Sequence, residues 1–92
     1  MEAKMKIKEG FMLREVAGSY VVVAVGKRSE QFNGMVNMNE TGAFLWKLVE
    51  KGASREELLD GLLQAYEVEP EKAAQDVDKF ISILQKNDFT EE

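Results

Sequence analysis

The 92-residue chain contains no cysteine, no histidine and a single proline. Without cysteine it can form no disulfide, thiolate metal site or iron–sulfur cluster, and it has no cysteine nucleophile. Without histidine it lacks the side chain that most often serves as a general base and as a transition-metal ligand. The composition therefore disfavours an enzyme, and we predict no catalytic residues, no metal site and no cofactor.

The chain also lacks a long hydrophobic run. Residues 1–8 do not contain the apolar segment of a signal peptide, and no stretch approaches the roughly 20 apolar residues that a transmembrane helix needs. We therefore expect a cytoplasmic protein that does not enter a membrane. The length fits one domain over residues 1–92, with a flexible start over residues 1–9.

The net charge of −5 is unevenly distributed along the chain. Residues 1–33 carry six basic and four acidic side chains, whereas residues 34–92 carry six basic and thirteen acidic ones. Proteins that bind nucleic acid present a basic face to the phosphates. The acidic second half therefore argues against a nucleic-acid partner.

Three segments in the first half of the chain predict β-strands. Residues 11–16 form the first, and Ala17-Gly18-Ser19 is typical of a turn. Residues 20–25 are continuously apolar and mostly β-branched, as expected of a central strand. The third strand covers residues 34–38, with Met35 and Asn37 on one side and Val36 and Met38 on the other. Short turns between the strands predict an antiparallel sheet.

Asn39 is a good N-cap for a first helix from Glu40 to Lys51, which Gly52 ends. Apolar side chains, Trp46 among them, cover most of its circumference, so we expect this helix and its tryptophan to be buried at the centre of the fold.

Two further helices follow. Ser54 and Glu57 predict a capping box at the start of the second helix. Its apolar stripe consists of Leu58, Leu59, Leu62, Leu63 and Tyr66. Pro70 suits the first position of the third helix, which extends to about Lys86, and we expect Phe89 to pack under the sheet. The order β-β-β-α-α-α predicts an α+β fold like a winged helix-turn-helix, with a three-stranded antiparallel sheet before three helices.

The run Met-Asn-Glu-Thr-Gly-Ala-Phe-Leu-Trp at residues 38–46 resembles the Leu-Asn-Glu-Thr-…-Leu-Trp signature of the PqqD-like family. Residues 54–59 and 65–71 extend the resemblance, which covers about residues 10–89. The chain departs from the family at two places. It ends in Asn87-Asp88-Phe89 where a Gly-Leu-Leu-like sequence is usual, and Glu69 precedes Pro70 where an aspartate is common.

The resemblance implies a RiPP recognition element, a module that binds the leader of a ribosomally made precursor peptide. Such a module presents the peptide to a modifying enzyme, often a radical S-adenosylmethionine protein. The leader is expected to add as a strand beside the third strand, in a groove that the third helix closes. The candidate peptide-binding residues are therefore Gly34, Met35, Val36, Asn37 and Met38 on the strand and Asp76, Lys79, Phe80, Ile83 and Asn87 on the helix.

Strand addition needs an open strand edge and neighbouring side-chain pockets. Gly34 would let another backbone approach closely, and methionines are adaptable apolar contacts. Met35 or Met38 could instead fill the core, because only one face of the strand points inward. Phe80 lies at the border of the buried helix stripe and Ile83 lies beyond it, so Ile83 is either part of the groove wall or an isolated exposed side chain.

Two other functions are compatible with this fold. A winged-helix DNA-binding regulator shares the topology, but residues 70–87 carry three acidic and three basic side chains and so lack the net positive charge of a recognition helix. A self-associating interaction module would use the exposed strand edge to form a homodimer.

Overall fold

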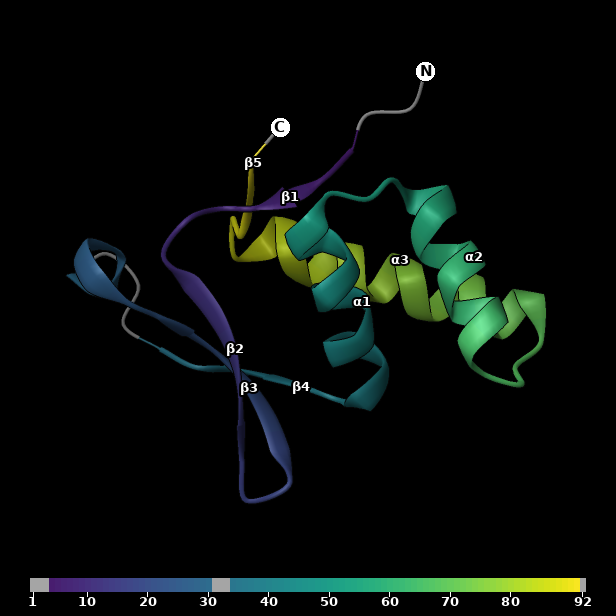
Figure 1. The fold of residues 1–92 in the computed structure, drawn as a ribbon, viewed down its shortest axis with the longest axis horizontal. Helices are drawn as coiled ribbons and strands as arrows, with labels where there is room; N and C mark the ends of the chain where they lie inside the picture. Colours follow the sequence, from purple (N-terminus) through teal and green to yellow (C-terminus); the bar gives the residue numbers. More distant parts are fainter. Residues whose placement is uncertain (1–3, 31–33, 92) are drawn as a thin grey trace.

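The computed structural model of the chain describes residues 4–30 and 34–91. Within these residues, a three-stranded antiparallel sheet precedes three helices (Figure 1). The sheet has the strand order β2 (Phe11–Val16), β3 (Ser19–Ala24) and β4 (Val36–Met38). The helices are α1 (Glu40–Lys51), α2 (Arg55–Ala65) and α3 (Pro70–Lys86). The predicted α+β, winged-helix-like fold is confirmed. No helix in the described part of the chain reaches the length and apolarity that crossing a membrane requires.

β3 is the central strand, as its composition predicts. It pairs with β2 from Phe11–Ala24 to Val16–Ser19, and with β4 from Val22–Val36 to Tyr20–Met38. The predicted alternation in β4 is confirmed: Val36 and Met38 are partly or fully buried, whereas Asn37 is exposed. β2 and β4 each pair on one side only among the described residues, so both edges of this sheet are open.

β4 is shorter than the predicted strand over residues 34–38, because Gly34 and Met35 lie outside the ladder. The β3–β4 pairing ends at Val22–Val36, although β3 continues to Ala24 in its pairing with β2; the short 3₁₀ helix η1 (Gly26–Glu30) follows β3. The Ser29 hydroxyl stabilises this turn by donating to the carbonyl of Gly26 at 2.6 Å. Residues 31–33, between η1 and β4, lie outside the described residues.

α1 is the centre of the fold. Leu45, Trp46 and Val49 have no exposed surface, which confirms that the tryptophan belongs to the core. Gly52 ends the helix with φ = 93°, a conformation that favours glycine. In Figure 1, α1 lies between the sheet on one side and α2 on the other.

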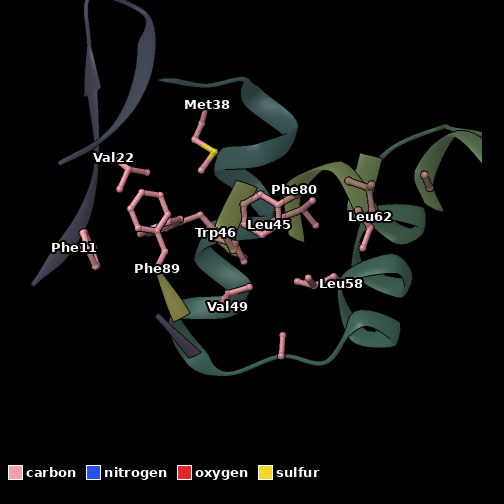
Figure 2. Packing of buried hydrophobic residues seen from close by; sticks show 14 residues of the cluster. Phe11, Val22, Met38, Leu45, Trp46, Val49, Leu58, Leu62, Phe80 and Phe89 are labelled. Atoms are coloured by element: carbon pink, nitrogen blue, oxygen red, sulfur yellow. The ribbon is translucent and has the colours of Figure 1, made fainter. Parts of the chain in front are cut away.

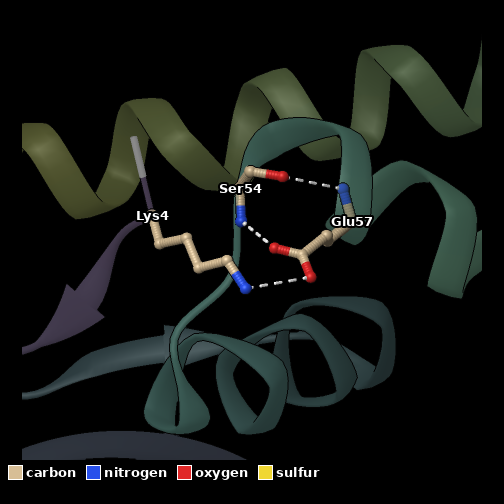
Figure 3. Close-up of polar contacts among 3 residues, drawn as sticks. All are labelled: Lys4, Ser54 and Glu57. Carbon is tan, nitrogen blue, oxygen red and sulfur yellow. Dashed lines mark hydrogen bonds and ion pairs between the residues drawn. The ribbon is translucent and has the colours of Figure 1, made fainter. Parts of the chain in front are cut away.

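The capping box of α2 is confirmed (Figure 3). The Ser54 hydroxyl accepts from the amide of Glu57 at 3.2 Å, and the Glu57 carboxylate accepts from the amide of Ser54 at 2.9 Å. The predicted apolar stripe of this helix is too wide, because Leu58 and Leu62 are buried but Leu63 is 36% exposed. One narrow face of α2 is enough to cover α1.

The C-terminal end of α3 turns the chain back towards the core. The amide of Phe89 donates to the carbonyl of Leu84 at 3.0 Å, and the amide of Asp88 donates to that of Gln85 at 3.2 Å. This pair of bonds is a Schellman motif, in which Asp88 takes the left-handed position with φ = 55°. An aspartate here thus replaces the glycine that usually occupies such a turn.

Phe89 has no exposed surface, which confirms its predicted place under the sheet. Its ring contacts Phe11 of β2 and Trp46 of α1 edge-on, with ring centroids 4.7 and 5.6 Å away (Figure 2). The last described residues therefore join the sheet to the central helix.

A second, two-stranded sheet was not predicted. β1 (Lys6–Ile7) pairs antiparallel with β5 (Thr90–Glu91), and the amide of Lys8 donates to the carbonyl of Phe89 at 2.8 Å. Lys6 to Lys8 are thus paired with residues more than 80 positions away in the chain, a pairing that leaves no local signal in the sequence. Residues 1–3 lie outside the described residues.

The β2–β3 turn offers a test of backbone strain. Ala17 and Gly18 both have positive φ, 51° and 80°, between the paired Val16 and Ser19. A two-residue hairpin turn of this kind favours Asn-Gly, because alanine is disfavoured in the left-handed region. We expect Ala17→Asn to stabilise the protein by about 1 kcal/mol and to raise Tm by about 4–8 °C. Ala17→Val should lower Tm, and an equal or higher Tm for the valine variant would contradict the turn geometry.

Removing the Phe89 ring should be among the most damaging core changes. We expect Phe89→Ala to reduce the free energy of unfolding by about 3–5 kcal/mol, because it leaves a cavity between α1 and the sheet. Phe89→Leu retains most of the apolar volume and should lose less than half as much. Urea denaturation followed by circular dichroism measures both values. Similar losses for both variants would mean that the ring contacts, rather than the filled volume, carry the stability.

Candidate functional site

A hollow of about 140 Å³ lies between α3 and the junction of β4 with α1. Six of the predicted peptide-binding residues line it together: Asn37, Met38, Asp76, Lys79, Phe80 and Ile83. The strand and the helix that the sequence predicted as two walls therefore do face one shared concavity.

The floor of the hollow is apolar. Met38 and Phe80 are only 7% and 3% exposed and belong to the core cluster, and the half-buried Ile83 packs against that cluster. Gly42 lies beside them, and a Cβ at this position would lie 3.1 Å from the sulfur of Met38. The missing side chain of Gly42 leaves the room that the methionine occupies.

The rim of the hollow is polar and carries both signs of charge. The carboxylate of Asp76 pairs with Lys72 one helical turn earlier, at 2.9 Å, and Lys79 is exposed. Asn39 uses its side-chain oxygen to accept from the amide of Gly42 at 2.7 Å, so it caps α1 and lines the hollow at once. An apolar floor within a polar rim suits a small number of apolar side chains on an otherwise polar ligand.

The open edge of β4 belongs to the same region. β4 pairs with β3 along one side, and among the described residues no strand pairs with its other side. Edge strands of this kind carry backbone donors and acceptors that another chain can use. The geometry thus combines a strand edge with an adjacent side-chain pocket.

Four predicted residues do not line this hollow. Met35 is 69% exposed and precedes the paired part of β4, so of the two methionines only Met38 is a core residue. Val36 packs against the core, and no atom lies within 4 Å of a Cβ built on Gly34, so the space beside Gly34 is open and the close approach of another backbone there stays a prediction. The side-chain amide of Asn87 donates to the backbone carbonyl of Ile83 at 2.9 Å at the end of α3.

The sequence prediction missed three residues of the hollow, namely Asn39, Thr41 and Gly42. They form the start of α1, directly after β4. The signal was present in the Asn-Glu-Thr-Gly motif, because a helix N-terminus that follows a strand without a loop must lie at the end of the same edge. No cluster of three potential metal-binding side chains occurs within the described ranges.

The double role of Asn39 can be tested by stability. We expect Asn39→Ala to lower the free energy of unfolding by about 1 kcal/mol, because the amide of Gly42 loses its acceptor. Asn39→Asp retains an acceptor at the N-terminus of α1 and should stay within about 0.5 kcal/mol of the parent protein. Thermal unfolding of the three proteins measures both differences. An unchanged Asn39→Ala protein would show that the cap contributes nothing.

Comparisons with known proteins support the sequence resemblance. The family model described as Coenzyme PQQ synthesis protein D (PqqD) matches residues 11–89. Among curated proteins, no sequence matches significantly.

Two solved structures have the same fold. TbiB1 in complex with the TbiA(beta) leader peptide has a TM-score of 0.73, with 21% identity over 94% of each chain. Lasso peptide synthetase B1 complexed with the leader peptide has a TM-score of 0.73, with 19% identity over 98% of this chain and all of the other. With its family match over most of its length, this chain belongs to the PqqD family.

Proposed function

We propose that this protein binds the leader of a ribosomally synthesised precursor peptide and presents it to a modifying enzyme. The observation that carries this proposal is the open edge of β4 directly beside the hollow against α3. The leader would add to β4 as a further strand, with backbone hydrogen bonds giving affinity and side chains in the hollow giving specificity.

The relatives support this reading of the edge. TbiB1 and lasso peptide synthetase B1 share the fold of this chain, and both are in complex with a leader peptide. The apolar floor of Met38, Phe80 and Ile83 is suited to apolar side chains that alternate along an extended peptide. A polar rim with Asp76 and Lys79 would then favour one peptide register over another.

The proposed role is that of an adaptor without a reaction of its own. The chain has no histidine and no cysteine, so it lacks the most common general base and any thiolate nucleophile. Holding the precursor next to an enzyme raises the effective concentration of the peptide there. In this family the enzyme is expected to be of the radical S-adenosylmethionine type, and that expectation is part of the proposal.

The charges around α3 support a peptide rather than DNA as the ligand. Lys72 pairs with Asp76, and Arg55 forms two contacts with Asp78, at 2.7 and 3.1 Å. The charges of two basic side chains are therefore neutralised within the protein, whereas a DNA-binding helix would direct such side chains to phosphates. No observation favours the regulator over the adaptor.

An amide NMR titration tests the proposal. The probe is a synthetic leader from the precursor gene encoded beside this one, added to the ¹⁵N-labelled protein. We expect saturable shifts at residues 36–38 and 76–83, because these line the edge and the hollow. The same spectra report on Gly34, Met35 and Asn87, whose role in binding stays a prediction. Saturable shifts confined to other regions would move the site, and their complete absence would count against the function.

Binding by two side-chain variants tests the hollow itself. We expect Ile83→Ala to weaken leader binding about tenfold, because it removes half-buried apolar surface next to the proposed peptide. Met12→Ala is the matched control, since Met12 is 44% exposed on β2 at the opposite edge of the sheet. Isothermal titration calorimetry measures both constants. Equal loss in both variants would refute the assignment of the hollow.

Two proline variants test the strand edge. Consecutive backbone amides of a strand point to opposite edges, so Val36→Pro and Asn37→Pro remove one amide directed at β3 and one directed outward. The variant that retains the unfolding transition of the parent is the informative one. We expect it to lose leader binding, and full binding by that variant would rule out strand addition at β4.

A further inference from the structure

The outer side of α2 carries apolar surface that the core covers only in part, because Leu59 packs against the core cluster whereas Leu63 does not. The helix covers α1 with Leu58 and Leu62, while Leu59 is half-buried and Leu63 is 36% exposed. Leu59 and Leu63 are four residues apart, so they lie next to each other on the helix surface. α2 thus has a second apolar stripe beside the one that stabilises the fold.

This stripe lies in a groove with an acidic rim. Leu59 and Leu63 share the groove with Glu56, Glu57 and Asp60, and its volume is about 640 Å³. A neighbouring hollow shares Glu57 and Asp60 and extends the surface to the α1–α2 contact. The rim therefore places three carboxylates within five consecutive residues around the half-buried Leu59 and the exposed Leu63.

The chain itself places a lysine on this rim. The ammonium of Lys4 lies 3.4 Å from the Glu57 carboxylate, whose other oxygen is bound in the capping box (Figure 3). The pKa of Glu57 is held below its ordinary value, chiefly because the amide of Ser54 donates to the carboxylate, so this part of the rim stays negative at neutral pH. The carboxylate of Asp60 accepts from the side-chain amide of Gln64 at 2.9 Å. Because this donor is neutral, the contact does not neutralise the charge of Asp60.

The groove is separate from the proposed leader site. It shares no lining residue with the hollow between β4 and α3. A second copy of this chain is a poor partner for it, because two such faces would bring like charges together. An acidic rim around an apolar stripe instead complements a segment with basic side chains around an apolar centre.

We propose that the α2 face, defined as Glu56, Leu59, Asp60 and Leu63, docks onto a basic amphipathic segment of the modifying enzyme. The identity of the partner as that enzyme rests on the proposed function. With the leader on β4 and the enzyme on α2, the two partners bind different surfaces of the adaptor. The adaptor can therefore hold both of them at once. Carboxylates at the rim guide the encounter, and burial of Leu63 stabilises the complex.

An NMR titration with a defined probe tests the α2 face. The probe is a twelve-residue amphipathic peptide of lysine and leucine only, with leucine along one helical face. We expect saturable shifts at residues 56–63 of the full chain and weaker binding at higher salt.

Two variants test the groove itself, the single variant Leu63→Gln and the double variant Glu56→Gln/Asp60→Gln. Each should weaken binding of the peptide at least about fivefold. Glu50→Gln is the matched control, because it removes a charge from an exposed position of α1 outside the groove.

Three results would overturn the α2-face proposal: shifts that do not saturate, equal weakening by Glu50→Gln, or equal binding of a peptide with glutamate in place of lysine. The leader titration on the same sample separates this proposal from the function, because its shifts are expected at residues 36–38 and 76–83. Leader binding without α2-face binding would refute only the second surface. Binding of the lysine peptide without leader binding would retain the basic-segment surface and refute the adaptor role.

Discussion

Phe89 reaches the core because Asp88 adopts a left-handed conformation that turns the chain back after α3. Its ring then fills the space between Phe11 of the sheet and Trp46 of the central helix. The carboxylate of Asp88 pairs with Lys8 at 2.7 Å, and the backbone of Lys8 binds that of Phe89. One turn therefore ties α3, the sheet, α1 and the first described strand together. The relative positions of β4 and α3, and hence the hollow between them, depend on this shared core.

The candidate site combines rigid and open parts. Met38 and Phe80 are core residues that also line the hollow, so the walls of the site are fixed by the same packing that stabilises the fold. Asn39 begins α1 immediately after β4, which leaves no loop between the strand edge and the helix. The strand edge, by contrast, is unpaired on its outer side within the described region. A preformed pocket beside an unpaired edge lowers the ordering cost that a peptide ligand must overcome.

Local signals predicted most of the fold. The N-cap at Asn39, the capping box at Ser54 and Glu57, and the alternation through Val36 and Met38 all depend on neighbouring residues, and all are confirmed. The β1–β5 sheet was missed because its pairing joins the two ends of the chain. The extension of the third strand to Gly34 was wrong because the β3–β4 ladder ends at Val22–Val36, and the point at which two strands part is not encoded in residues 34 and 35 alone. For the hollow, helix periodicity identified Phe80 and Ile83, but the contribution of Gly42 depends on the position of Met38 in space.

The second apolar stripe of α2 illustrates how a helix can carry more hydrophobic surface than its own packing needs. Periodicity alone assigns Leu59 and Leu63 to the core, because they adjoin Leu58 and Leu62 on the helix. The contact with α1 is close and narrow, since a Cβ at Gly61 would lie 3.0 Å from a Leu48 methyl group, and so Leu59 is only partly covered and Leu63 is exposed. Acidic neighbours keep such a stripe soluble and at the same time select for a basic partner. In a chain this small, the helix that completes the core therefore also presents apolar surface at Leu63, on a face that shares no lining residue with the hollow beside β4.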